Sequence, residues 1–195
     1  MIDAGANKGQ FSLAFRSERP TAQIIAFEPL TGAADTFEAV FAGDDRFRLE
    51  RCALAASKGS ATFHVADRAD SSSLLSLGPK QERAFGVRQD TTIEVSVRRL
   101  DECVAVSELS RPVMLKVDVQ GGELGLFEGL SEIGDIDFIY VELSYIELYV
   151  DQPLFHNVTS YLAAHGFRVI GVFNQVFTPE FGPTQADVLF RRAVG

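Results

Sequence analysis

Short apolar runs and segments with a helical repeat of apolar residues alternate over the first part of the chain. Strands are indicated at residues 1–4, 23–27 and 46–52, and helices are indicated at 9–18 and 31–42. Strands that alternate with helices in this way predict a parallel sheet with right-handed crossover connections. The opening segments therefore belong to an α/β fold.

The middle of the chain changes to a period of two. Residues 60–65 and 92–97 alternate apolar and polar positions, as half-exposed antiparallel strands do. A long polar stretch separates them and includes successive serines at 71–73. Because a loop of that length in a compact domain is usually functional or mobile, we expect an inserted β-hairpin whose connection lies near a binding site.

The alternation of strands and helices resumes towards the C-terminus. The predicted strands lie at 113–119, 136–143, 167–173 and 186–192, and the predicted helices at 100–109, 122–130 and 153–165, the last closed by Gly166. The chain has 195 residues and no stretch that looks like a linker. We therefore expect a single Rossmann-like α/β domain over residues 1–195.

The charge balance and the cysteines narrow the functional classes. With 18 basic and 27 acidic residues and a formal net charge of -9, the chain is a poor partner for nucleic acid. No apolar run is long enough to span a membrane and no secretory signal begins the chain, so we expect a cytoplasmic protein. Cys52 and Cys103 lack metal-ligand spacing, so we expect two buried thiols rather than a zinc site or a disulfide.

A glycine-bearing turn after the first predicted strand is the strongest local signal. Asp3, Gly5, Asn7 and Gly9 occupy alternate positions where the strand passes into a helix. Glycines there let the backbone turn tightly and approach a ligand. Glu28 ends the next strand, where a carboxylate can accept hydrogen bonds from both hydroxyls of a ribose. The turn, the helix and this acid indicate a nucleoside cofactor.

Charge separates the candidate cofactors. Dinucleotides place an anionic pyrophosphate over a loop with the spacing Gly-x-Gly-x-x-Gly. In this chain the spacing is Gly-x-x-x-Gly, and the carboxylate of Asp3, which precedes it, would repel a pyrophosphate. The same carboxylate would attract the ammonium group of a methionine moiety. The sequence therefore favours S-adenosylmethionine over NAD.

Two further acids lie at the carboxyl ends of predicted strands. Asp118 follows Lys116 in an otherwise apolar strand, and Glu142 ends the next strand, so both lie where open α/β sheets bind ligands. We expect Asp118 to contact the cofactor and to act as a general base, with Glu142 and His64 as other candidates. A helix N-cap, or a partner for Lys116, is the structural alternative for Asp118.

Three residues are candidates for binding a substrate. Ser72 and Ser73 lie on the long polar connection, and Glu123 lies in the first turn of the helix after Asp118. Ordinary loop chemistry is the structural alternative for the serines, and stabilisation by the helix macrodipole is the alternative for Glu123.

In order along the chain, these motifs resemble the FkbM family of S-adenosylmethionine-dependent methyltransferases. The resemblance covers nearly the whole chain and rests on residues 3–11, 26–29, 52–54 with Gly59, the serines before Leu74, 99–102, 115–123 and 141–143. It implies a class I methyltransferase fold, a mostly parallel seven-stranded sheet with an antiparallel last strand. It also implies O-methylation of a hydroxyl on a small metabolite, sugar or polyketide.

The resemblance assigns roles to the matching positions. Gly5, Asn7 and Gly9 would surround the methionine part of the cofactor, Glu28 would bind its ribose, and Asp118 would lie beside the methyl group. Members of the family carry further chain before the opening strand, so we expect either a truncated opening segment or a minimal member of the family with a more open site. An uncovered edge or face there would favour a homodimer.

Other classes of function remain as alternatives. The first is a non-catalytic module on the same fold that binds a nucleoside or a protein, and the second is an NAD-dependent oxidoreductase, which the loop spacing disfavours. Asp118 and Glu142 could share a divalent ion, but the sequence shows no dense set of oxygen ligands, so no metal is expected.

Overall fold

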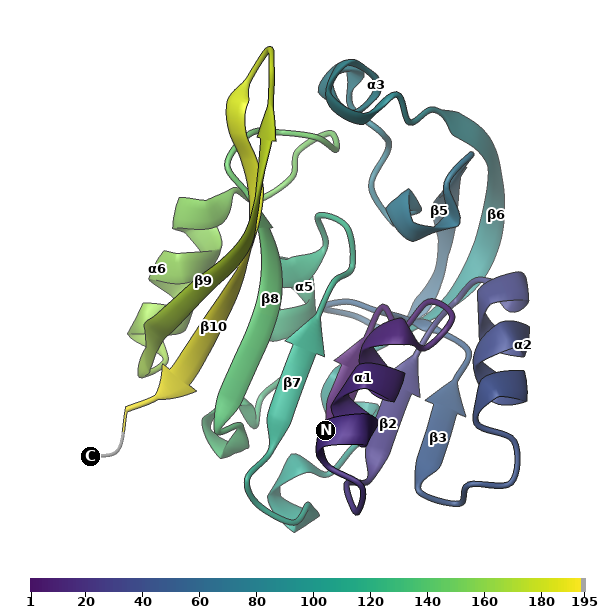
Figure 1. Cartoon of the computed structure of the whole chain (residues 1–195), viewed down its shortest axis with the longest axis vertical. Helices are drawn as coiled ribbons and strands as arrows, with labels where there is room; N and C mark the ends of the chain where they lie inside the picture. Colours follow the sequence, from purple (N-terminus) through teal and green to yellow (C-terminus); the bar gives the residue numbers. More distant parts are fainter. Residues whose placement is uncertain (194–195) are drawn as a thin grey trace.

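A seven-stranded sheet forms the centre of the protein, seen here in a computed structural model that describes residues 1–193 (Figure 1). In spatial order its strands are β3 (Phe47–Glu50), β2 (Ile24–Phe27), β1 (Ile2–Ala4), β7 (Met114–Val117), β8 (Phe138–Ser144), β10 (Gly182–Arg192) and β9 (Phe167–Thr178). The neighbours from β3 to β8 pair in parallel, and β10 runs antiparallel to both β8 and β9. The predicted fold class is confirmed, including the antiparallel last strand.

Helices pack on both faces of this sheet. The helices are α1 (Gln10–Glu18), α2 (Thr31–Val40), α3 (Pro79–Phe85), α4 (Leu100–Cys103), α5 (Glu123–Glu128) and α6 (Phe155–Ala164), with 3₁₀ turns at Ala69–Ser71, Val106–Glu108 and Ile133–Asp135. In Figure 1, α1 lies in front of the sheet and α5 and α6 lie behind it. The main core joins buried residues of β7, β8 and β10 to α5 and α6, and a smaller cluster joins β2 to α2. Within residues 1–193, no helix is long and apolar enough to cross a membrane.

A small second sheet is inserted between β3 and β7. It contains β4 (Ala53–Leu54), β6 (Gln89–Arg98) and β5 (Gly59–Ala66), and β5 and β6 form the expected antiparallel pair. Residues 67–88, which connect β5 to β6 and which we call the roof, were expected to be a loop. The roof instead contains α3, which starts with Pro79 in its first turn and ends at Gly86 in the left-handed conformation.

Three other predicted elements, one helix and two strands, differ clearly in length from the sequence-based ranges. The helix expected at 100–109 ends at Cys103, because Val104 adopts an extended conformation and is buried in the main core. The last two strands extend beyond the expected ranges 167–173 and 186–192 and form one long hairpin. Cys52 and Cys103 are free thiols as expected, but only Cys52 is buried.

A buried ion pair joins the two central strands. Asp3 of β1 lies opposite Lys116 of β7, and the Lys116 ammonium is 3.1 Å from an Asp3 carboxylate oxygen. Both side chains are almost fully buried. The Ser12 hydroxyl of α1 donates to Asp3 at 2.6 Å, and Lys116 donates to the Gly5 carbonyl at 2.6 Å. Burial works against the ammonium, but the charges of Asp3 and Asp118 outweigh it and raise the pKa of Lys116. The pair therefore fixes β1, β7, α1 and the turn after β1 to one another.

The ion pair gives a test by double substitution. Lys116→Met should lower the free energy of unfolding by about 3–5 kcal/mol, because it leaves the Asp3 carboxylate buried without its counter-charge. Adding Asp3→Asn should recover part of that loss, because the remaining buried groups are then neutral. Urea unfolding followed by circular dichroism measures both. Equal stability of the wild type and Lys116→Met would contradict the assignment.

Candidate active site

The turn after β1 is fixed in place by close backbone packing. Gly5 has a φ of +74°, and a Cβ atom at this position would collide with the backbone carbonyl of Asp118. Glycine is therefore required where the turn meets the end of β7. Asn7 is also left-handed, with a φ of 48°, and its backbone N–H donates to Glu28 at 2.8 Å. The turn thus joins the ends of β1, β2 and β7.

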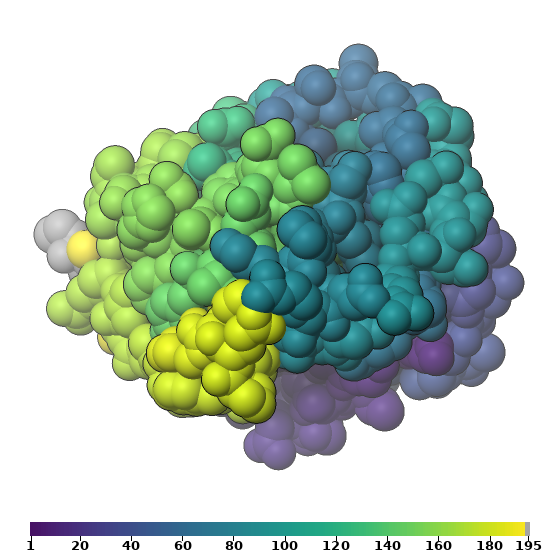
Figure 2. Space-filling view, turned by 90° about the horizontal axis from the view of Figure 1, so that it is seen from above, coloured from purple at the N-terminus to yellow at the C-terminus, as the bar shows by residue number. Residues whose placement is uncertain are grey.

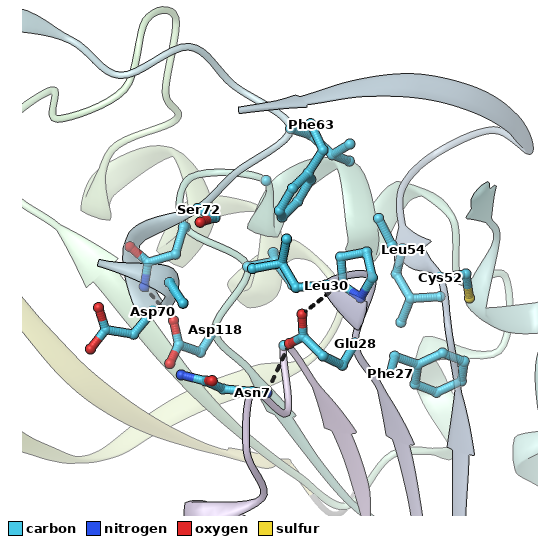
Figure 3. A pocket seen from close by; sticks show the side chains of 18 residues that line it. Asn7, Phe27, Glu28, Leu30, Cys52, Leu54, Phe63, Asp70, Ser72 and Asp118 are labelled. Atoms are coloured by element: carbon cyan, nitrogen blue, oxygen red, sulfur yellow. Dashed lines mark hydrogen bonds between the residues drawn. The ribbon is translucent and has the colours of Figure 1, made fainter. Parts of the chain in front are cut away.

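A pocket opens beside this turn, between the ends of β1 and β2 and the roof (Figure 3). Glu28 lies at its floor and accepts hydrogen bonds from the backbone N–H groups of Asn7 and Leu30, both at 2.8 Å. Burial raises the pKa of this carboxyl despite those bonds. Apolar side chains line the wall away from Asp118, namely Phe27, Pro29, Leu30, Leu54, Phe63 and Leu74. A carboxylate beside an apolar wall suits a ribose joined to a flat, apolar base.

A second hollow adjoins the first, and we call it the acidic pocket. It shares Gly5, Asn7, Asp70 and Asp118 with the first pocket. Its remaining side chains come from α1 and from β7 to β10, and include Phe11, Lys116, Tyr140, Glu142, Asn174 and Asp187. Because the two hollows meet at Asp118, a ligand that filled the first could present a reactive atom to the second.

Three carboxyl groups form a row across the acidic pocket. Val117 pairs with Val141, which places Asp118 next to Glu142, and Glu142 pairs with Asp187. The Gln120 amide donates to Asp118 at 2.6 Å and to Glu142 at 3.2 Å. Burial and the neighbouring charges of Asp118 and Asp187 raise the pKa of Glu142 well above its ordinary value. Desolvation also raises the pKa of Asp118, against the opposing charge of Lys116.

Asp187 is a site residue that the sequence did not reveal. Its carboxylate accepts from the Tyr140 hydroxyl at 2.8 Å and from the Asn174 amide at 2.7 Å. The other candidate acids follow apolar runs, where parallel strands end, but β10 is antiparallel and begins at that same edge, so Asp187 lies near the start of its strand. An acid near the start of an expected antiparallel last strand was therefore the signal to look for.

Several predicted residues line these pockets, whereas Asp3 and Gly9 do not. Gly5, Asn7, Glu28, Ser72, Asp118 and Glu142 line one or both of them. Asp3 was expected to meet the ammonium group of the cofactor, but it is buried against Lys116 and Ser12, so it positions the turn instead. Gly9 faces α2, where a Cβ would collide with the rings of Phe37 and Phe41.

Two of the three predicted substrate residues also lie behind the pocket surface. Ser73 is fully buried, and its hydroxyl donates to the Gln120 carbonyl at 2.7 Å, which ties the roof to the loop after β7. Glu123 is buried and accepts from the Gly121 N–H at 2.9 Å. Burial raises the pKa of Glu123 to about 7. Both residues hold the wall of the site in position.

His64, the third candidate base, lies on the outer part of the small sheet. Its ring nitrogens are 2.8 Å from the Gln89 amide oxygen and 3.2 Å from the Ser76 hydroxyl, and it lines neither pocket. Within residues 1–193, no group of three or more His, Cys, Asp or Glu side chains is arranged to hold a metal ion.

Contacts between the roof and the C-terminal hairpin cover the site from above (Figure 2). Arg83 of α3 pairs with Glu180 at the tip of the β9–β10 hairpin and lies over the ring of Phe181, 5.2 Å from its centroid. Below them, the Tyr149 hydroxyl lies 2.9 Å from the Ser71 carbonyl and 2.7 Å from the Gln120 amide oxygen. The roof is thus joined to the tip of the C-terminal hairpin and, through Tyr149, to Gln120 in the loop after β7.

The sheet order, the glycine turn and the acid that ends β2 define the class I methyltransferases, whose cofactor is S-adenosylmethionine. Solved structures support this class at the level of the fold. A methyltransferase FkbM from Methylobacillus flagellatus aligns with a TM-score of 0.59 and 16% identity, over 96% of this chain and 42% of that one. Streptococcus pneumoniae Sp1610 in complex with S-adenosyl-L-methionine aligns with a TM-score of 0.54 and 11% identity, over 100% and 66% of the two chains.

The methyltransferase FkbM domain matches residues 3–169, and the chain belongs to this family. The 2-O-methyltransferase NoeI of Sinorhizobium fredii is 32% identical over 78% of this chain and 66% of its own length. The 31-O-demethyl-FK506 methyltransferase FkbM of Streptomyces tacrolimicus is 27% identical over 100% of this chain and 81% of its own. This chain thus spans slightly less than two-thirds of NoeI. The family resemblance and the cofactor predicted from the sequence are confirmed.

The buried carboxyl of Glu123 predicts how stability depends on pH. Its pKa of about 7 in the folded protein lies above its ordinary value, so the folded state binds this proton more tightly than the unfolded state. The contribution of Glu123 to stability is therefore lost as the pH rises from its unfolded pKa through about 7. Glu123→Gln should remove up to about 3 kcal/mol of this loss.

Thermal melts at pH 5 and pH 8 measure the effect. The difference in Tm between the two pH values should be smaller for Glu123→Gln than for the wild type. Glu128→Gln, at an exposed position on the same helix, is the matched control and should leave the difference unchanged. If the difference in Tm between pH 5 and pH 8 were the same in Glu123→Gln as in the wild type, Glu123 would already be ionised at neutral pH.

Proposed function

We propose that this chain methylates a hydroxyl oxygen of a small metabolite, sugar or polyketide, with S-adenosylmethionine as the methyl donor. The observation that carries the proposal is the row of Asp118, Glu142 and Asp187 next to the glycine turn and Glu28. These acids offer proton acceptance and hydrogen bonding at the point where the two pockets meet. The names of NoeI and of FkbM from Streptomyces tacrolimicus, both O-methyltransferases, support transfer to oxygen.

The residues present fit this cofactor. The side-chain oxygen of Asn7 is buried and has no hydrogen-bond partner among residues 1–193, although Asn7 lines both pockets. An ammonium group would satisfy that oxygen. Glu28 retains lone pairs for ribose hydroxyls after accepting two backbone N–H groups. The apolar wall, which includes Phe27, Leu54 and Phe63, would hold the adenine.

The chemistry then divides between the cofactor and the chain. When bound, S-adenosylmethionine supplies an electrophilic methyl group on a sulfonium. The protein aligns the acceptor oxygen with that methyl group, an effect that can lower a barrier by about 7–11 kcal/mol. The acceptor hydroxyl gives its proton to the Asp118 carboxylate as the carbon–oxygen bond forms and the carbon–sulfur bond breaks. Lys116, 3.8 Å from Asp118, opposes the desolvation that raises the pKa of this carboxyl.

Glu142 and Asp187 bind the acceptor on the side away from the cofactor. Burial and the charges of Asp118 and Asp187 raise the pKa of Glu142, which favours the protonated form that can donate a hydrogen bond as well as accept one. Tyr140 and Asn174 hold one oxygen of Asp187 and leave the other for a donor on the acceptor. The acidic pocket is lined by four carboxyl groups, those of Asp70, Asp118, Glu142 and Asp187. Because an anionic acceptor would be repelled by them, the pocket favours a neutral or cationic acceptor.

Three broader predictions go with this proposal. Residues 1–195 act as one methyltransferase domain, the acceptor is a small molecule rather than nucleic acid or a membrane, and the reaction takes place in the cytoplasm. All three rest on the sequence and remain predictions.

Calorimetric titration with S-adenosylhomocysteine, run beside NAD, tests the cofactor. The wild type should bind the first ligand and not the second. Glu28→Gln should weaken binding about tenfold or more, because a neutral amide is a poorer acceptor for two ribose hydroxyls. The control is Glu50→Gln, at the end of the neighbouring strand in a surface ion pair with Arg48. Binding of neither ligand would favour the alternative of a protein-binding module.

Two substitutions separate proton transfer from acceptor binding, once a screen of hydroxylated compounds has given an acceptor. Asp118→Asn should lower kcat by about 100-fold or more and leave the affinity for S-adenosylhomocysteine within a few fold. Asp187→Asn should instead raise the KM of the acceptor and leave kcat within a few fold. Full turnover in Asp118→Asn with normal cofactor binding would eliminate Asp118 as the base.

A further inference from the structure

Strand β9 is an exposed apolar edge. It is the last strand of the large sheet and pairs only with β10 among the described residues. Within residues 1–193, six of the ten large apolar side chains that remain exposed lie on this strand, with exposed fractions from 36% to 63%: Val169, Ile170, Val172, Phe173, Val176 and Phe177. Surface strands rarely combine an open backbone edge with so much apolar surface.

The open edge determines what kind of partner it fits. Every second residue of an edge strand points its N–H and C=O groups outward, and another β-strand satisfies such a row in full. Apolar side chains on both faces of β9 would be covered only if the partner extended the sheet and brought apolar side chains of its own. The partner therefore contributes an apolar β-strand.

Charge favours a second copy of this chain at this edge. The chain has a formal net charge of -9, so most of its surface repels a second copy. Strand β9 contains no acidic residue, and its single charged residue is Arg168. Antiparallel pairing brings the Arg168 end of one strand towards the hairpin tip of the other, where Glu180 lies. The strand thus carries no charge that would repel a second β9, and its apolar side chains match those of the copy.

We propose that β9 is the interface of a homodimer, in which the β9 strands of two copies pair antiparallel about a twofold axis. Such a pairing uses the same patch on both copies and closes the assembly at two subunits. The exposed fractions of the six side chains amount to roughly 500 Å² on each copy, so at most about 1,000 Å² of apolar side chain would be covered in the pair, which is about the lower limit for a specific interface. The large sheet would then continue from one protomer into the other.

The interface strand also forms part of the acidic pocket. Asn174 of β9 donates to Asp187 and lines the pocket beside it. Asn174 has a φ of 45°, and the register between β9 and β10 shifts on either side of it. Pairing between the β9 strands would hold this irregular segment in place. The proposal does not depend on methyl transfer, because the assembly can be measured without cofactor or acceptor.

Sedimentation velocity of the purified chain, from low to high micromolar concentration, tests the dimer. The wild type should shift from monomer to dimer over this range. Val172→Lys should raise the dissociation constant at least about tenfold, because two like charges would face each other near the twofold axis. Ile170→Lys is a second variant with the same expected effect. Both residues are exposed in the protomer, so the fold should remain, as circular dichroism can verify.

The matched control is Ile93→Lys, an exposed apolar residue on β6 of the small sheet, and it should dimerise like the wild type. Hydrogen exchange adds a backbone readout, because the outward amides of β9 should be protected in the dimer and exchange in Val172→Lys. A wild type that stays monomeric throughout would overturn the proposal, since the edge would then be open or take a different partner. A dimer that survives Val172→Lys, or one that Ile93→Lys abolishes, would also overturn it.

Discussion

The buried ion pair between Asp3 and Lys116 is the interaction on which the rest of the site depends. Two charges inside a sheet are costly unless they are paired, and here the Ser12 hydroxyl also donates to Asp3 while Lys116 donates to the Gly5 carbonyl. Those bonds reach α1 and the glycine turn, so one charge pair sets the position of both relative to β1 and β7. Asp3, the acid of β1, thus holds structural elements together. The carboxyl groups of Glu28, Asp118, Glu142 and Asp187, which lie on or after other strands, line the pockets instead.

The inserted small sheet and the roof cover the pocket at the end of the large sheet. Phe63 and Leu74 bring apolar surface over the pocket next to Glu28, and Ser73 reaches down to the loop after β7. The C-terminal hairpin meets the roof from the other side through Arg83 and Glu180. Segments far apart in the sequence therefore build one enclosure, and the parallel sheet supplies only its floor.

The sequence predicted the fold well because each strand and helix of an α/β fold shows its own local spacing of apolar residues. The glycine turn, Glu28, Asp118 and Glu142 followed from that pattern, since carboxyl ends of parallel strands share one edge. The features that the sequence did not predict depend on contacts between segments far apart in the chain. Nothing near Asp3 in the sequence shows that Lys116 lies opposite it, and nothing near Ser73 shows that it points into the protein. Asp187 was missed for a related reason, because it lies on the strand whose direction is reversed. Helix α3 was missed because its residues are mostly polar, although Pro79 and Gly86 mark its two ends.

Position 120 shows how narrowly one side chain can be constrained by its surroundings. The Gln120 amide receives the Tyr149 hydroxyl on its oxygen and donates from its nitrogen to Asp118 and Glu142. A carboxylate there would add a negative charge to two existing acids, and an ammonium or guanidinium group would offer no acceptor to Tyr149. Asparagine is one methylene shorter and could not span the same distance. The three neighbours together therefore require both an amide oxygen and an amide nitrogen at this distance, although Gln120 need never touch the atoms that react.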